Sequence, residues 1–270
     1  MPPRPRTRRP RAAPPARKPQ DRKFVTALSR GLDVLRCFGP RDRWLANQEI
    51  AKRTGLAKPT VSRLAYTLTR LGHLRFSPAT NKYALGSAAL SLGYAALAQM
   101  DIRRIARPLM QSLAEHTSAA VHLSVRDRHS MILIDTYRNS SAVIVDIGAR
   151  VPMATTSIGR AWVCALPAAR SREVLDELRA SLGPEWPALK RAFDQAFREY
   201  AEHGYCLGLG EWRREVNGIS VPLALPDGAD PVVFSCSGAA FQLEPDVLRN
   251  DIGPRLLALV GNVRSALATD

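Results

Sequence analysis

The sequence predicts an α+β protein of two domains, a small, mainly helical one at the N-terminus and a larger one that mixes strands and helices. Three observations predict this arrangement. All of the excess positive charge lies in the first third of the chain. Within that third, three segments with helical spacing are followed by a short hairpin. After Thr117 the apolar residues change to the alternating pattern that is typical of strands.

The charge is divided unevenly along the 270 residues, which carry a formal net charge of +15. Residues 1–23 hold nine lysines and arginines against one acid, and residues 24–84 hold eleven against three. Residues 85–270 are almost neutral, with nineteen against twenty. A basic surface confined to one domain indicates binding to a polyanion such as DNA. The alternative is a charge bias that only increases solubility.

Composition also limits the class of protein. No run of 18 or more apolar residues predicts a membrane span, and the basic N-terminus lacks the apolar segment of a secretory signal. The cysteines are widely spaced and form no C-x-x-C pair, so we expect a reduced, cytoplasmic protein without disulfides or a zinc cluster. They are Cys37, Cys164, Cys206 and Cys236.

Residues 1–22 combine seven prolines with many arginines and cannot form a core, so they predict a disordered basic arm. Such an arm either lies along DNA phosphates or is an unconstrained tail.

Residues 23–85 predict a winged helix-turn-helix domain. Its expected elements are helices over 28–38, 47–54 and 58–71 and strands over 73–76 and 82–85. Gly39-Pro40 and Gly55 end the first two helices, and Pro59 suits the first turn of the third. The predicted core consists of Ile50, Ala51, Leu56, Val61, Leu64, Leu68 and Leu71.

The outward face of the third helix carries hydroxyl and cationic groups that suit phosphates and base edges in a major groove. The predicted DNA-binding residues are Lys58, Thr60, Ser62, Arg63, Tyr66, Thr67 and Arg70, with Arg75 and Lys82 from the hairpin. The alternative is an amphipathic helix whose polar face only meets water.

Residues 86–118 predict a helical linker with many small apolar residues, which suits packing against a second chain in a dimer. The alternative is packing within the same chain. In the second half of this linker, Asp101 is expected to cap the helix and Pro108 to break or kink it.

Residues 119–270 predict an α+β domain with an antiparallel sheet. Strands are expected over 121–125, 131–137, 142–146, 218–224 and 232–237, and helices over 158–166, 171–182, 186–203 and 245–267. The last helix is expected to kink at Gly253-Pro254.

Several separated segments, in the same order along the chain, match one known pattern. They are residues 25–35, 49–64, 71–74, 148–161, 202–205, 218–223 and 233–238. In these segments the sequence resembles the IclR-type bacterial transcription regulators over roughly residues 24–268. The resemblance implies a GAF-like effector domain, a dimer or a dimer of dimers, and repression or activation controlled by a small organic acid, aromatic or short-chain.

The resemblance also implies which residues bind the effector. They are Ser157, Ile158, Gly159, Glu211, Asn217, Gly218, Ser235 and Ser237. Relatives often have an aspartate in the loop where this chain has Glu211.

The chemistry of these residues agrees with an acid-binding site. Peptide N–H groups at the start of the helix near Ile158 have no intrahelical partner and attract a carboxylate. Ser235 and Ser237 alternate on one strand, so their hydroxyls share a face. The alternative is that Ser157 only caps its helix and the strand serines pack beneath it.

The sequence therefore favours a ligand-responsive, sequence-specific DNA-binding regulator. The alternative is an architectural DNA-binding protein whose C-terminal domain only oligomerises. Enzymatic activity is not expected, because no H-E-x-x-H motif occurs and a lone cysteine near His122 is more often a core residue than a nucleophile. No metal is expected, because the spacing of His116, His122, His129 and His203 suggests no site. No cofactor is expected, since Gly208-Leu209-Gly210 lacks the third glycine of a dinucleotide loop.

Overall fold

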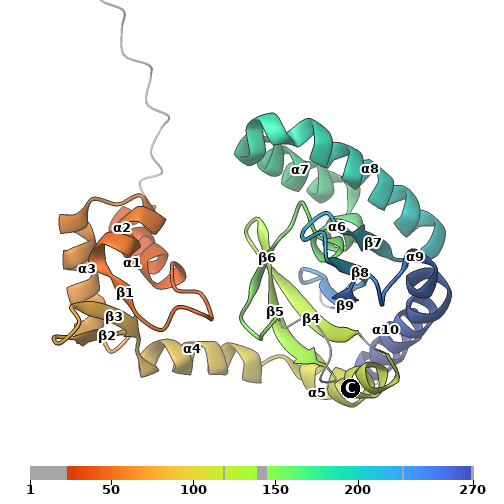
Figure 1. Ribbon diagram of the computed structural model, residues 1–270, viewed down its shortest axis with the longest axis horizontal. Coiled ribbons are helices and arrows are strands. Elements are labelled where there is room, and N and C mark those ends of the chain that lie inside the picture. The colour runs from red at the N-terminus through yellow and green to blue at the C-terminus, as the bar shows by residue number, and fades with distance from the viewer. Residues whose placement is uncertain (1–22, 118, 139–144, 227, 269–270) are drawn as a thin grey trace, which may run out of the picture.

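The computed structural model describes residues 23–117, 119–138, 145–226 and 228–268. The predicted arm over 1–22 lies outside these residues, as does most of the predicted strand over 142–146, and residues 145 and 146 are not in a strand. Among the described residues, no helix has the length and apolarity to span a membrane. Figure 1 shows a small N-terminal domain joined to a larger C-terminal domain by a helix, α4.

The N-terminal domain is the predicted winged helix-turn-helix. Its elements are α1 (Thr26–Arg36), β1 (Leu45–Ala46), α2 (Asn47–Thr54), α3 (Lys58–Arg70), β2 (Leu74–Ser77) and β3 (Lys82–Leu85). The strands form an antiparallel sheet in the order β1-β3-β2, of which β1 was not predicted. Gly55 ends α2 with a φ of +69°, a left-handed conformation that sets the sharp turn into α3.

The core of this domain agrees with most of the predicted residues. Ile50, Val61 and Leu68 are buried, and the half-buried residues Ala51, Leu56 and Leu64 pack against them. Leu71 is 62% exposed, so its predicted place in the core is wrong. It follows the last residue of α3, where the chain turns toward Gly72 and leaves the buried face of the helix.

The predicted linker forms two helices, α4 (Ser87–Ala98) and α5 (Asp101–His116). All twelve residues of α4 are described and none is buried. Its large apolar side chains are instead mostly exposed: Leu90 to 74%, Leu92 to 63% and Tyr94 to 72%.

At α5, the predicted cap at Asp101 and the predicted break at Pro108 are wrong, whereas the alternative of a kink at Pro108 stays a prediction. Met100, not Asp101, occupies the cap position, and no side chain caps the helix there. The helix is not broken at Pro108 but continues to His116. Proline removes one backbone hydrogen bond, and burial of apolar residues on both sides of it, such as Ile102 and Met110, offsets that loss.

The C-terminal domain is α+β, as predicted, and is built on a six-stranded antiparallel sheet in the order β6-β5-β4-β9-β8-β7. The strands are β4 (Ala120–Asp127), β5 (Ser130–Tyr137), β6 (Arg150–Pro152), β7 (Cys206–Leu209), β8 (Val216–Leu223) and β9 (Val232–Ala239). Strands β6 and β7 lie at the two edges of the sheet and were not predicted. Both are short, so their alternating pattern is too brief to recognise.

Helices cover both faces of this sheet (Figure 1). They are α6 (Ser157–Cys164), α7 (Ala168–Leu182), a 3-10 turn at Gly183–Glu185, α8 (Trp186–His203), α9 (Pro245–Val247), a π-helical segment at Leu248–Ile252 and α10 (Gly253–Leu267). The π-helical turn lies directly before the predicted kink at Gly253-Pro254. Helices α5 and α10 pack on one face of the sheet, and α6 to α8 belong to the core on the other.

The central strands present different residues to these two layers. On β4, Val121 and Leu123 belong to the core under α5 and α10, whereas His122 between them faces α6. On β9, Phe234 belongs to the same core and Ser235 faces α6. The layer between the sheet and α6 therefore contains buried polar side chains, His122 and Ser235 among them.

Ion pairs join the two domains at one place. The Asp33 carboxylate on α1 lies 3.6 Å from the Arg128 guanidinium in the β4–β5 turn. The Arg36 guanidinium, one turn further along α1, lies 3.9 Å from Asp127 in the same turn.

Candidate functional site

The predicted DNA-binding residues belong to α3 and the hairpin, and most of them are open to solvent. Lys58, Ser62, Arg63, Tyr66, Thr67, Arg70 and Arg75 are exposed, and Thr60 and Lys82 are half-buried. Tyr66 is 65% exposed, although an aromatic ring in a monomeric domain is usually covered. Together these residues therefore present cations, hydroxyls and a ring to solvent.

Two side chains of α2 fix the start of α3, and sequence reasoning missed both. Asn47 Nδ2 donates a hydrogen bond to Ser62 Oγ, and Lys58 Nζ donates one of 3.3 Å to Gln48 Oε1. The N-termini of the two helices are thus tied together by polar side chains. Asn47 and Gln48 could have been found, because they occupy the first turn of the helix that precedes a recognition helix.

Arg75, one of the two predicted cations of the hairpin, is held by contacts within the domain. The Arg75 guanidinium lies over the Trp44 ring at 5.5 Å, and its Nε donates a hydrogen bond to the Leu85 carbonyl. Phe76 and Tyr83 pair across the strands with ring centroids 5.0 Å apart. The wing is therefore stiffened by aromatic contacts, with Arg75 held at its base.

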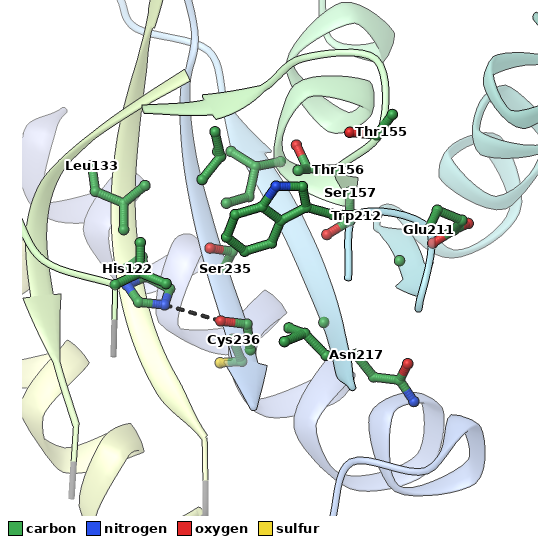
Figure 2. Close-up of a pocket in the computed structure, with 17 residues that line it drawn as sticks. His122, Leu133, Thr155, Thr156, Ser157, Glu211, Trp212, Asn217, Ser235 and Cys236 are labelled. Atoms are coloured by element: carbon green, nitrogen blue, oxygen red, sulfur yellow. Dashed lines mark hydrogen bonds between the residues drawn. The ribbon is translucent and has the colours of Figure 1, made fainter. Parts of the chain in front are cut away.

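A second candidate site is a cavity between the sheet and α6, shown in Figure 2. The empty space in the cavity and in the open solvent at its mouth is together about 490 Å³. It is lined by His122, Leu133, Val145, Val151, Thr155, Thr156, Ser157, Ile158, Gly208, Glu211, Trp212, Val216, Asn217, Gly218, Ser235, Cys236 and Ser237. All of the predicted effector-binding residues except Gly159 belong to this lining.

Gly159 is absent from this lining, so its predicted contact with the effector stays a prediction. Its N–H donates a hydrogen bond of 3.2 Å to Thr156 Oγ1 and is not open to a ligand. A Cβ at Gly159 would lie 2.1 Å from the Met153 carbonyl oxygen. Glycine is required there because α6 packs directly on the backbone of the loop before it.

Thr156, and not Ser157, caps α6. In addition to accepting from Gly159, Thr156 Oγ1 donates a hydrogen bond of 2.8 Å to the Pro152 carbonyl. Ser157 is freed from capping and shares a hydrogen bond of 2.8 Å with Ser220 Oγ on β8. Ser157 and Ile158 occupy the first turn of α6, where backbone N–H groups have no intrahelical partner. This turn suits a carboxylate.

His122 forms part of the cavity wall and was not predicted as a site residue. Its Nδ1 lies 3.1 Å from Thr136 Oγ1 and its Nε2 lies 3.0 Å from Ser237 Oγ. Complete burial lowers the pKa of His122 to about 4, and the charge of Arg138 adds to the shift. The imidazole is therefore neutral at pH 7. The signal in the sequence was a polar residue that alternates with the apolar residues Val121 and Leu123 of the expected strand.

The mouth of the cavity is formed by the loop between β7 and β8. Figure 2 shows the Trp212 indole between Thr155 on one side and His122 on the other. The Arg213 guanidinium lies over the Trp212 ring at 4.3 Å. The residue before Trp212 is Glu211. Its carboxylate pairs with the buried Arg160 at 3.2 Å and accepts a hydrogen bond from the Leu209 N–H. The charge of Glu211 is thus compensated within the protein.

The structure contains neither a disulfide nor a cluster of three or more metal-ligating side chains within the described ranges. Cys164 and Cys206, which are far apart in sequence, lie with their sulfur atoms 4.0 Å apart.

Comparison with known proteins gives a consistent match along the chain. A model of the IclR helix-turn-helix domain matches residues 27–78, and a model of the bacterial transcriptional regulator IclR C-terminal domain matches residues 94–244. The HTH-type transcriptional regulator TsaQ1/TsaQ2 of Comamonas testosteroni is 32% identical over 248 residues, which cover 90% of this chain and 89% of that protein.

Comparison with solved structures gives the same match. An IclR family transcriptional regulator from Brucella abortus is 45% identical, with a TM-score of 0.82 over 92% of this chain and 95% of that one. An IclR homologue from Microbacterium hydrocarbonoxydans, crystallised with 4-hydroxybenzoate, is 23% identical, with a TM-score of 0.65 over 91% of this chain and 100% of that one. At that identity the likeness is one of fold.

Proposed function

Since the chain belongs to the IclR family of bacterial transcriptional regulators, a family of DNA-binding proteins and not of enzymes, we propose that a small organic acid in the cavity controls its affinity for a specific operator. The observation that carries this proposal is the first turn of α6, where Ser157 and Ile158 meet the cavity. Of the described residues that line the cavity, none is a lysine or an arginine, so the donors for a carboxylate are neutral groups, among them the backbone N–H groups of this turn.

The rest of the lining favours a ligand with an apolar body. Leu133, Val145, Val151 and Val216 form apolar walls, and Trp212 adds an aromatic surface. A planar ring stacks well on an indole and buries its faces against branched side chains. The likeness in fold to the regulator bound to 4-hydroxybenzoate supports an aromatic acid.

The proposed function includes a dimer, which the exposed apolar helix α4 supports. Leu90, Leu92 and Tyr94 on α4 are exposed by more than 60%. Exposed apolar patches of this kind mark interfaces between proteins. A second copy of the chain is the fitting occupant, because two DNA-binding domains read two half-sites with useful specificity. A dimer of such dimers is compatible with the same contact.

The test is a fluorescence-anisotropy titration of the full-length protein on DNA from upstream of its own gene, at two salt concentrations. A panel of aromatic and short-chain acids is then added to the complex. We expect sequence-specific binding, and a change in affinity with one class of acid that corresponds to a coupling of about 1–3 kcal/mol. Tight binding that ignores both sequence and acid would instead favour an architectural protein.

Arg63 on α3 provides a prediction about operator reading. We expect Arg63→Ala to weaken binding to the operator by about 1–3 kcal/mol, because a bidentate contact to a guanine edge is lost. Binding to scrambled DNA should change much less. The same titration on both DNAs measures this difference.

The control for Arg63→Ala is Arg43→Ala, which removes the same charge from an exposed position outside α3. It should weaken binding to both DNAs slightly and equally. If Arg63→Ala also lowers both affinities equally and reduces the salt slope by about one, Arg63 contacts a phosphate and not a base.

A further inference from the structure

Two cysteines that are far apart in sequence meet where α6 packs on β7. Cys164 is the last residue of α6, and Cys206 is the first residue of β7. Both are free thiols, and their sulfur atoms lie 4.0 Å apart. A disulfide bond is about 2.05 Å long, so these atoms need to approach by only about 2 Å to form one.

Contacts along α6 hold the helix against β7, and Figure 1 shows the two elements side by side. At the start of the helix, a Cβ built on Gly208 would lie 3.3 Å from the Ser157 nitrogen. Near the middle, Arg160 Nη2 donates a hydrogen bond of 2.8 Å to the Leu207 carbonyl. At its end the two sulfur atoms meet. The sulfur atoms are therefore held close together by the folded domain, and no unfolding is needed to join them.

The two thiols differ in their access to solvent. Cys206 is fully buried, and its thiol donates toward the Cys164 sulfur and toward the Ala196 carbonyl. The hydrogen bond to Cys164, together with burial, raises the pKa of Cys206 far above that of an ordinary thiol. Cys164 is only half-buried. A dissolved oxidant therefore meets Cys164 first, while Cys206 remains a protonated thiol beside it.

We propose that Cys164 and Cys206 form an oxidation site for hydroperoxides, in which Cys164 is oxidised first and Cys206 then closes a disulfide that ties α6 to β7. A pair of this kind suits a reducing compartment, where disulfides are usually transient or redox-sensing. The half-buried Cys164 sulfur also gives a small dithiol access to the bond, so that thiol–disulfide exchange restores both thiols.

The chemistry takes place in two steps. In the first, Cys164 loses its proton and its sulfur attacks the terminal oxygen of the hydroperoxide. The O–O bond breaks, Cys164 becomes a sulfenic acid, and the departing alkoxide takes up the proton as an alcohol, or as water when the oxidant is hydrogen peroxide. In the second, the Cys206 sulfur attacks the Cys164 sulfur, the S–O bond breaks, and hydroxide leaves with the Cys206 proton as water. The two thiols together lose two electrons, and the peroxide gains them.

Cys37 provides a matched control within the same chain. Like Cys164, it is half-buried at the end of a helix, since it directly follows α1. Its thiol donates a hydrogen bond of 3.0 Å to the Val34 carbonyl and not to a second sulfur. Burial raises its pKa to about 11. Because the thiolate is the form that attacks a peroxide, Cys37 should react slowly.

The test treats the reduced, full-length protein with graded hydrogen peroxide, alkylates the remaining thiols and maps the cysteine peptides by mass spectrometry. We expect a disulfide between Cys164 and Cys206, formed about tenfold faster than Cys37 is lost. Dithiothreitol should restore all four thiols. The disulfide should also raise the melting temperature by roughly 5–10 °C, because it closes a long loop in the unfolded chain.

Single variants separate the two steps. In Cys206→Ala, Cys164 should stop at the sulfenic acid, which dimedone labels, and no disulfide should form. In Cys164→Ala, Cys206 should stay reduced at the same dose, because the accessible thiol of the pair is missing. The control Cys37→Ala should form the disulfide at the unchanged rate. Mapping of the unmodified protein decides the inference even if a variant fails to fold.

Three results would overturn the inference. One is an unmodified protein that keeps the Cys164 and Cys206 thiols at a dose that oxidises Cys37. Another is a mixture of disulfides that includes Cys37 or Cys236, which would show that the chain unfolds before it is oxidised. The third is equally fast oxidation of Cys206 in Cys164→Ala. A reducing agent in the operator titration keeps all thiols free, so that titration decides the proposed function separately.

Discussion

Replacing Gly159 with alanine is expected to destroy the native packing of the C-terminal domain. The added methyl group would lie 2.1 Å from the carbonyl oxygen and 2.3 Å from the Cα of Met153. Both are backbone atoms, so no side chain can rotate to relieve the contact, and α6 must move away from its loop. Overpacking of this kind costs about 3 kcal/mol or more. Near-ultraviolet circular dichroism during heating measures the loss through Trp162, Trp186 and Trp212, which all belong to this domain.

The control for this prediction is Gly261→Ala. Gly261 lies in α10 of the same domain, and a Cβ there meets no atom within 4 Å. Alanine favours a helix over glycine by roughly 0.5–1 kcal/mol, so this variant should melt at an equal or higher temperature. If Gly159→Ala melts at the same temperature as the unmodified protein, α6 does not pack on Met153 as described.

Placing two negative charges on α4 is expected to separate the dimer and to abolish useful operator binding. Leu90→Glu with Tyr94→Glu changes two apolar side chains that lie one turn apart and are both more than 70% exposed. A dimer that closes over this helix would bury both charges without partners. Losing the second half-site contact should weaken operator binding by about 10²–10⁴-fold. Light scattering coupled to size-exclusion chromatography reports the mass, and anisotropy reports the affinity.

The matched variant carries the same two charges at the ends of the same helix, Ser87→Glu and Gln99→Glu. Both positions are exposed and polar in the native chain, so we expect an intact dimer with a modest loss of DNA affinity from the added negative charge. A monomeric unmodified protein, or a Leu90→Glu/Tyr94→Glu variant that stays dimeric, would show that α4 does not form the interface.

The N-terminal domain could be predicted almost completely from the sequence because its signals are local. Gly55 and Pro59 mark the turn between two helices, and the predicted third helix differs from α3 at its C-terminal end only, by one residue. Leu71 was misplaced because helical spacing continues past the residue at which the helix stops. The spacing of apolar residues alone does not show where the helix ends.

The cavity was harder to predict, because it depends on contacts between segments far apart in the sequence. Ser235 and Ser237 were expected to share a face, and the structure brings both to the cavity. His122 was not assigned, since only the pairing of β4 with β9 places it next to Ser235. Gly159 was assigned to the effector, but a small residue at a helix start serves either a ligand or a close backbone contact. Only the position of Met153 distinguishes these roles.

The ion pairs between α1 and the β4–β5 turn set an energy scale for control of the DNA-binding domain. Asp33–Arg128 and Arg36–Asp127 are 3.6 and 3.9 Å long and partly exposed, and such pairs contribute about 0–1 kcal/mol each. Together they hold the orientation of the domain with roughly 2 kcal/mol at most. A ligand whose affinity for one orientation of the domain is about thirtyfold higher than for another supplies about the same free energy. Under the proposed function, an effector with that preference would offset both ion pairs, so its preference between the two orientations matters more than its overall affinity.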